Sequence, residues 1–186
     1  DISNLSTPTM VGSVVSGGGA CGIDISVRGK YAYISTTLQN GALYVYDVSN
    51  PVAPTLVNTF LNGNGRSVHI DGSYLYAGTS NGFNIFDISD PLNITTAFTT
   101  VTALGKVAVA GRYGYSAAAD SFNVIDISNP ASAVVVGTVA GISGTANVPA
   151  IQGRYVYVTS TTNLYVVDVS VDKSSISSNL NLLLYT

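Results

Sequence analysis

GKYAYIST, residues 29–36, is an eight-residue phrase that returns three more times along the chain. Each copy begins with Gly and then places two tyrosines two positions apart. The other copies are GSYLYAGT (72–79), GRYGYSAA (111–118) and GRYVYVTS (153–160). Side chains alternate across a strand, so the two tyrosines of a copy share one face, and the Gly before them suits a tight turn. The phrase predicts a turn followed by a strand, repeated along the chain.

A second phrase, Asp-(Ile/Val)-Ser, accompanies the first and gives the period of the repeat. Its copies begin at Asp1, Asp47, Asp87 and Asp126 and, in degraded form, at Asp168, with spacings of 46, 40, 39 and 42 residues. Such a period is typical of propeller blades and of short helical repeats. The polarity pattern decides between them, because apolar residues alternate with period two in runs separated by Gly, Asn or Pro signals. In one unit these runs are 66–70, 74–79, 83–88 and 94–100. Four short antiparallel strands per repeat form one propeller blade.

The predicted fold is therefore all-β, a single β-propeller domain or propeller segment over residues 1–186. We expect four complete four-stranded blades, at about 20–60, 65–101, 105–139 and 146–186. Outer strands are expected at both ends of the chain, at 179–185 and at 8–14, and the second of these is one more than four blades need. Since a blade buries its core only against its neighbours, we expect a piece of a larger propeller or a subunit whose partner supplies closure.

Composition excludes several functional classes. The chain is 46% apolar, only 9% of its residues are charged, and its ten acidic residues are all Asp. The seven basic residues are scattered, so no nucleic-acid partner is expected, and no apolar stretch reaches membrane-span length. A lone Cys21 allows no internal disulfide and no zinc site, and we expect no cofactor and no metal. The opening DISNLSTPT is not a signal peptide, so we expect that a leader was removed or that the chain is part of something longer. The Asn/Ser/Thr/Tyr-rich surface favours an extracellular or cell-surface location, and the sequons at Asn4 and Asn93 fit it.

Both repeated phrases are interpreted as scaffold. Eight of the twelve tyrosines occupy the paired positions, which we expect to pack between blades. The Asp of the second phrase is expected to build a turn by accepting backbone N–H groups, and the Pro that follows it in three copies ends the ladder. One carboxylate per blade is too few for calcium.

Polar residues that break the repeat lie where the first strands line the propeller axis. Five residues before the turn Gly stand Asp24, Ser67, Lys106 and Val148, and three before it stand Ser26, His69, Ala108 and Ala150. His69 as a base oriented by Asp24, with Lys106 nearby, would make a hydrolase or lyase site. The alternative is a hydrogen-bonded core His and a structural ion pair between Asp24 and Lys106.

Loops offer the other candidate site. The Gly-rich segments 16–22 and 62–66 join one blade to the next, on the face shared with the polar loops between second and third strands. No helix follows them, so they are not phosphate-binding loops. Variable polar loops on a rigid scaffold are typical of binding surfaces. The candidate binding residues of the chain are Asp24, Gln39, Asn40, Asn62, Asn64, Arg66, His69, Lys106 and Asn147.

The third-strand phrases LYVYDVSNP (43–51), FNVIDISNP (122–130) and LYVVDVS (164–170) resemble the LVIVD repeat. The resemblance covers about residues 1–170 and departs from the pattern at DVSVDKSS (168–175), which lacks Asn-Pro. It implies a β-propeller of bacterial or archaeal surface proteins, with no agreed catalytic residues.

Three functions remain open at this point. The first is a non-catalytic extracellular or cell-surface module that presents polar loops to a glycan or protein. The second is a structural assembly subunit whose N-terminal strand completes a blade of a neighbouring chain. The third is a hydrolase or lyase with an axial site at Asp24, His69 and Lys106.

Overall fold

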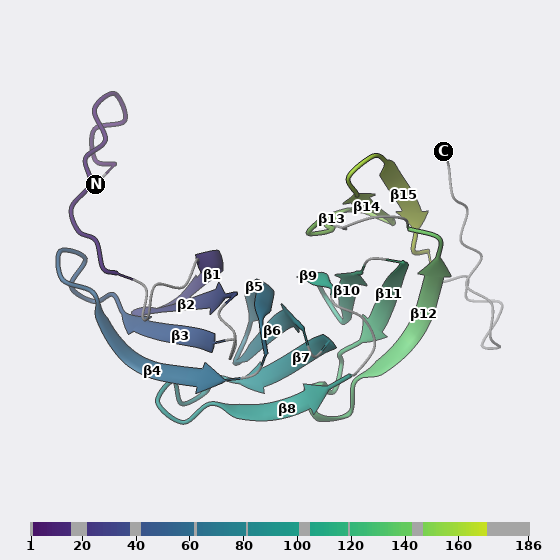
Figure 1. Ribbon diagram of the computed structural model, residues 1–186, viewed down its shortest axis with the longest axis horizontal. Helices are drawn as coiled ribbons and strands as arrows, with labels where there is room; N and C mark the ends of the chain where they lie inside the picture. The colour runs from purple at the N-terminus through teal and green to yellow at the C-terminus, as the bar shows by residue number, and fades with distance from the viewer. Residues whose placement is uncertain are drawn as a thin grey trace.

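The structure is a computed structural model that describes residues 2–15, 22–37, 42–61, 63–80, 82–100, 105–118, 120–142 and 147–170. These residues form antiparallel sheets set side by side in an open arc (Figure 1). The first strand of each sheet lies on the concave side of the arc, and the fourth strands lie on its convex side. The predicted all-β propeller architecture is confirmed, and the arc is not closed.

Each sheet is ordered as the chain runs, first strand to last. The first sheet contains β1 (Gly22–Arg28), β2 (Tyr31–Thr36), β3 (Ala42–Asp47) and β4 (Thr55–Leu61). The second contains β5 (Gly65–Asp71), β6 (Tyr74–Thr79), β7 (Gly82–Asp87) and β8 (Thr95–Thr99). The third contains β9 (Lys106–Ala110), β10 (Tyr113–Ala117), β11 (Ser121–Asp126) and β12 (Val134–Ala140), with the 3-10 helix η2 (Pro130–Ser132) before β12. The fourth contains β13 (Ala150–Gln152), β14 (Tyr155–Thr159) and β15 (Leu164–Asp168). We call these sheets blades 1 to 4.

Two expected outer strands have different outcomes. Residues 179–185 lie outside the described part of the chain. Residues 8–14 are described and belong to no strand. The reason is that β4 already occupies the outer position of blade 1, so this segment meets no free edge where the chain begins its first blade. It runs past the loop after β3 instead, where Gly12 lies so close to Pro51 that a Cβ would overlap the Pro51 carbonyl oxygen.

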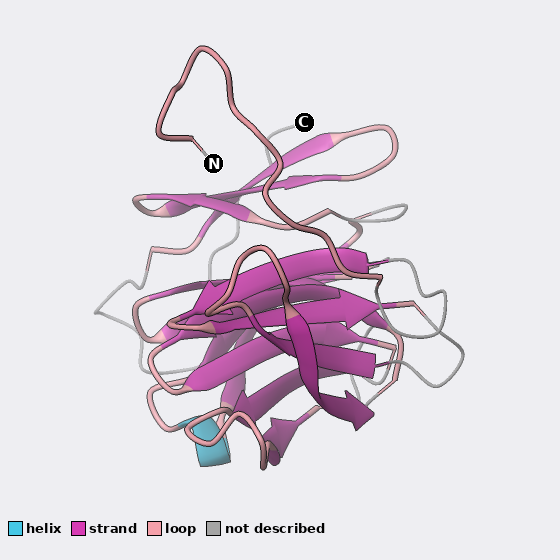
Figure 2. Ribbon diagram, turned by 90° about the vertical axis from the view of Figure 1, so that its left-hand side faces the viewer, coloured by secondary structure: helices cyan, strands magenta, loops and turns pink. Residues whose placement is uncertain are grey.

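The connections between successive strands lie alternately at the two opposite ends of the sheets (Figure 2). We call these the turn end and the loop end. The turn end carries the connection between first and second strands and the one between third and fourth strands. The loop end carries the connection between second and third strands and the one that leads to the next blade.

The turn end explains both repeated phrases. The Gly that opens each tyrosine phrase has a positive φ, between 55° and 59°, in all four blades. A Cβ there would meet nothing within 4 Å, so Gly is needed for its backbone conformation and not for space. The Asp of the second phrase accepts the N–H of the Ser two residues later, as Asp47 does from Ser49 at 2.8 Å. Equivalent bonds join Asp87 to Ser89, Asp126 to Ser128 and Asp168 to Ser170. The predicted turn function of this Asp is confirmed.

Most of the hydrophobic core lies between blades, with one cluster at each of the three junctions, and a smaller cluster of Ala32, Tyr44 and Tyr46 lies within blade 1. Tyr33, Leu43 and Val45 of blade 1 pack with Val68, Leu75 and Phe86 of blade 2. The same pattern joins blade 2 to blade 3 through Tyr76, Phe83 and Ile85, and blade 3 to blade 4 through Tyr115, Phe122 and Val124. The second tyrosine of each of these phrases is therefore inter-blade packing, as predicted.

Candidate functional site

The axial row of polar residues serves as a series of links between blades. On the inner strand of blade 1, the Asp24 carboxylate accepts the N–H of Val68 of blade 2 at 3.0 Å. The buried Ser67 Oγ of blade 2 accepts the N–H of Val107 of blade 3 at 2.7 Å. In both cases the residue five before one turn Gly bonds to the residue four before the next.

The third link has different chemistry at the same positions. The Lys106 side chain has no hydrogen-bond acceptor. The residue that it would face in blade 4 is Pro149, which has no N–H to donate. Lys106 Nζ donates instead to Asn147 Oδ1 at 3.2 Å. Two departures from the repeat thus compensate each other, which is the reason that a Lys is tolerated in this row.

The structure does not assemble Asp24, His69 and Lys106 into a catalytic group. Both Asp24 carboxylate oxygens accept backbone N–H groups, from Val68 and from Ile25. Within the described residues, neither a hydrogen bond between Asp24 and His69 nor an ion pair between Asp24 and Lys106 is formed. The alternative of a structural ion pair between Asp24 and Lys106 is therefore wrong. His69 is half-buried on β5, opposite Tyr76 of β6.

The ion pairs of the described residues lie at the turn end, where they reinforce the repeated phrases. The basic residue after the turn Gly reaches the Asp of its own blade: Lys30 to Asp47 at 3.2 Å, Arg112 to Asp126, and Arg154 to Asp168. Each cation also lies 5.2 to 5.3 Å from the ring centre of the tyrosine that follows it. Blade 2 has Ser73 at this position, and Arg28 of blade 1 donates to its hydroxyl at 3.4 Å.

These contacts lower the pKa of the turn-end carboxyls. Hydrogen bonds from Ser49, supported by Lys30, lower the pKa of Asp47 to about 2. Hydrogen bonds from Arg112 and Arg154 hold the pKa of Asp126 and Asp168 at about 2 as well. Sequence analysis missed the pairing, although Gly-(Lys/Arg)-Tyr upstream of each Asp-x-Ser was its visible signal.

The loop end contains the remaining candidate binding residues. Asn64 Oδ1 and Arg66 Nε are buried atoms with no hydrogen-bond partner within the described structure. Asn147 is exposed and bonds to Lys106 and, through its Nδ2, to Thr159 Oγ1 at 3.2 Å. Gln39, Asn40 and Asn62 lie outside the described residues. The loop end thus offers amide and guanidinium groups with unused hydrogen-bonding capacity.

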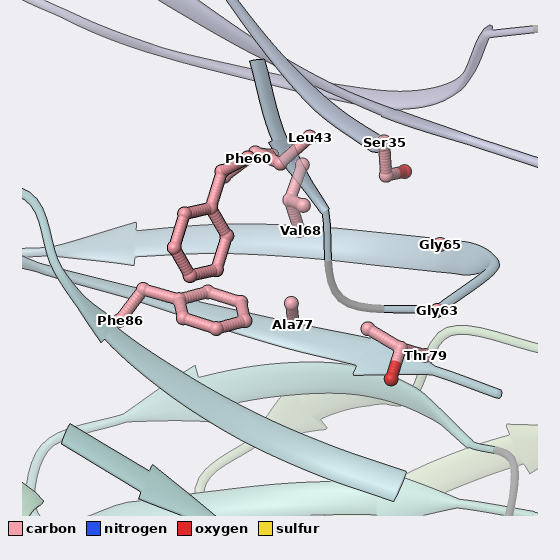
Figure 3. Close-up of a pocket in the computed structure, with 9 residues that line it drawn as sticks. All are labelled: Ser35, Leu43, Phe60, Gly63, Gly65, Val68, Ala77, Thr79 and Phe86. Carbon is pink, nitrogen blue, oxygen red and sulfur yellow. The ribbon is translucent and has the colours of Figure 1, made fainter. Parts of the chain in front are cut away.

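A small apolar cavity between blades 1 and 2 is not a ligand site. It is lined by side chains that include Leu43, Phe60, Val68 and Phe86 (Figure 3). Its volume is about 20 Å³, enough for roughly one water molecule. It marks imperfect packing at a blade junction.

The described part of the chain contains neither a metal-binding cluster nor a membrane-spanning helix. Over the described ranges, no group of three His, Cys, Asp or Glu side chains is placed to hold a metal ion. In the same ranges, no helix is long and apolar enough to cross a membrane.

Comparisons with known proteins agree with the geometry. The sheet order, the hydrophobic core between blades and the repeated turn hydrogen bonds define a protein of the β-propeller class. The family model of the LVIVD repeat matches residues 1–16, 17–61, 62–102, 104–140 and 143–182, so the chain belongs to the LVIVD-repeat family. No curated protein matches it significantly.

Two solved structures of computationally designed proteins share the arrangement. Ika4 superposes with a TM-score of 0.68 at 11% identity, over 88% of this chain and 100% of its own. Ika8 superposes with a TM-score of 0.65 at 13% identity, over 82% of this chain and 47% of its own. This chain therefore spans about half of Ika8, and the likeness concerns the fold alone.

Proposed function

We propose that this chain is a non-catalytic extracellular or cell-surface module that binds a glycan or a protein at the loop end of its blades. The observation that carries the proposal is the pair of buried, unpartnered atoms Asn64 Oδ1 and Arg66 Nε. A buried polar atom without a partner costs free energy, and both side chains are partly exposed, so a ligand that draws these two atoms to the surface of the loop and bonds to them gains affinity there. The repeated Asp residues of the turn end are less available, because the carboxylates of Asp47, Asp126 and Asp168 already bond to N–H groups and to cations.

Among the described residues, Asp24, His69 and Lys106 do not come together as a catalytic group, and this supports the non-catalytic part of the proposal. A general base must reach the proton that it removes and is usually oriented by a neighbour. The Asp24 carboxylate is committed to two backbone N–H groups and does not orient His69 within the described residues. We therefore expect His69→Ala to leave the binding of the glycan or protein at the loop end unchanged.

Binding is tested on a glycan array and against purified surface proteins of the source cell. Asn64→Ala and Arg66→Gln remove the two unpartnered groups and are expected to weaken binding at least tenfold. Arg28→Gln, at the turn end, is the matched control that changes the same charge. A wild-type chain that binds neither class, or a loss of equal size in Arg28→Gln, would show the proposal to be wrong.

The extracellular location is tested separately. Asn93 of the second sequon is exposed, in the loop between β7 and β8. We expect intact source cells to expose the protein to a membrane-impermeant amine reagent. Labelling that requires cell lysis would contradict the location and leave the binding result standing.

The second candidate function is assembly by strand addition, favoured by the N-terminal segment. Residues 2–15 form no strand, yet they expose Met10, Val11, Val14 and Val15. The family model of the LVIVD repeat also matches residues 1–16, a segment shorter than the other four matches. An exposed β-prone segment of this kind adds readily to a free sheet edge.

Strand addition is tested in the full-length chain with Val11→Pro, which blocks a ladder. Val11→Thr is the control, because it keeps the N–H and the branched side chain. If both variants have the same oligomeric state as the wild type, residues 8–14 do not complete a neighbouring blade.

A further inference from the structure

The two ends of the arc carry the two halves of one contact that the chain makes three times internally. In each internal junction, the leading blade contributes the second tyrosine of its phrase and two residues of its third strand. The following blade contributes residues of its first strand, such as Val68 in blade 2 and Val107 in blade 3. Blade 4 has no blade after it within the described chain, and blade 1 has none before it.

The free face of blade 4 repeats the leading half of this contact. Its members are Tyr157, Val166 and Leu164, at the positions of Tyr33, Val45 and Leu43 in blade 1. Leu164 is 57% exposed, whereas its three equivalents, Leu43, Phe83 and Phe122, are at most 6% exposed. Blade 4 therefore carries the residue types of an interior junction on this face, but its Leu164 is exposed where the equivalent residues of the other blades are buried.

The free face of blade 1 repeats the following half. Ile25 and Val27 of β1 are 56% and 58% exposed, whereas Val68 and Val107, the equivalents of Ile25, are at most 7% exposed. Farther out on the same face Tyr46 is buried, and its hydroxyl donates to the Val15 carbonyl at 3.4 Å. The uncovered part of this face is therefore its inner strand.

The axial links are consistent with joining these two faces. Val148 of blade 4 occupies the linking position and has no side-chain acceptor. The N–H that it would face, that of Ile25, already donates to Asp24 Oδ1 of its own blade at 2.9 Å. A junction from blade 4 to blade 1 thus leaves no linking N–H unsatisfied.

We propose that a second copy of this chain covers both faces, so that two arcs close into a ring of eight blades. Blade 4 of each copy packs against blade 1 of the other through Tyr157, Val166 and Leu164 on one side and Ile25 and Val27 on the other. The occupant is a second copy because the two faces are complementary halves of an interface present in the chain itself. Closure rests on blade faces and depends neither on the loop-end ligand nor on strand addition by residues 8–14.

The test is the mass of the full 186-residue chain in solution, measured by light scattering and sedimentation equilibrium. The expected mass is twice the 19.1 kDa of one chain. Leu164→Asp and Ile25→Asp are each expected to reduce it to the mass of one chain with an unchanged circular dichroism spectrum, because both side chains are exposed in a single arc. Val52→Asp is the matched control: Val52 is as exposed but lies in the loop after β3, so the dimer should persist.

Three results would overturn closure by a second copy. A single-chain mass of the wild type at every concentration leaves the faces uncovered. A dimer that survives both Leu164→Asp and Ile25→Asp uses another surface. A series of larger oligomers means that the contact continues from copy to copy without closing.

Discussion

Tyr76→Ala tests whether the repeated tyrosine holds the blades together. Tyr76 is 3% exposed, and its ring centre lies 6.3 Å from that of Phe83 within the cluster shared with blade 3. A buried aromatic side chain removes roughly 150–250 Å² from water, which at about 25 cal/mol per Å² corresponds to roughly 4–6 kcal/mol as an upper estimate. Measured truncations of buried aromatic residues to Ala cost about 3–5 kcal/mol. We expect a loss near 4 kcal/mol, a large part of a typical stability of about 5–15 kcal/mol.

The assay is urea unfolding followed by circular dichroism, with two companion variants. Tyr76→Phe keeps the ring and removes only the hydroxyl, whose pKa burial raises to about 12, so we expect a change below about 1 kcal/mol. Leu92→Ala changes an exposed apolar residue and should cost less than about 0.5 kcal/mol. If Tyr76→Ala unfolds like Leu92→Ala and loses only ligand binding, the tyrosine phrase is a binding signature and its interpretation as scaffold is refuted.

Three further outcomes are expected. The free energy of unfolding should be constant near neutral pH and fall as pH drops from 3.8 toward about 2. The reason is that the carboxyls of Asp47, Asp126 and Asp168 have a lower pKa in the folded than in the unfolded chain. A stability curve that is flat over that window contradicts the turn-end pairing. Gly111→Ala should cost about 1–2 kcal/mol in urea unfolding, since φ is +59° there while space is free, and a neutral effect would show that the turn relaxes. Ser67→Ala should cost about 1–3 kcal/mol by leaving the Val107 N–H without its acceptor, whereas Ser67→Thr should recover part of that loss.

The strands were predictable because the signals that specify them, alternating polarity and Gly turns, lie within a few residues of each strand. The runs expected at 74–79 and 83–88 are strands β6 and β7 within one residue, since alternation and Gly turns act over neighbouring positions. The Asp-x-Ser turn was predictable for the same reason, as donor and acceptor lie two residues apart.

The contacts between blades were harder to predict. Asp24 breaks the repeat, so the sequence pattern made it a candidate catalytic or binding residue. Its carboxylate instead accepts a backbone N–H 44 residues away, and backbone N–H groups carry no sequence signature. Burial of Ser67 likewise follows from the packing of blade 3 on blade 2. At the loop end, the unpartnered atoms of Asn64 and Arg66 depend on how that loop folds, which alternation does not specify.

The compensating pair of Lys106 and Pro149 makes the order of the blades a property of the sequence. A unit from blade 1 or 2 supplies an acceptor to its successor, whereas the unit of blade 3 supplies an ammonium and tolerates only a successor without an N–H at that point. Exchange of blades 2 and 4 by recombination would therefore place Lys106 against the Val68 N–H and leave Asp24 facing the Pro149 nitrogen, a tertiary amide without a hydrogen to donate. Duplication of a blade succeeds only when the copied unit matches both of its new neighbours. This repeat protein thus grows or rearranges along its chain only in particular combinations, although its blades have the same fold.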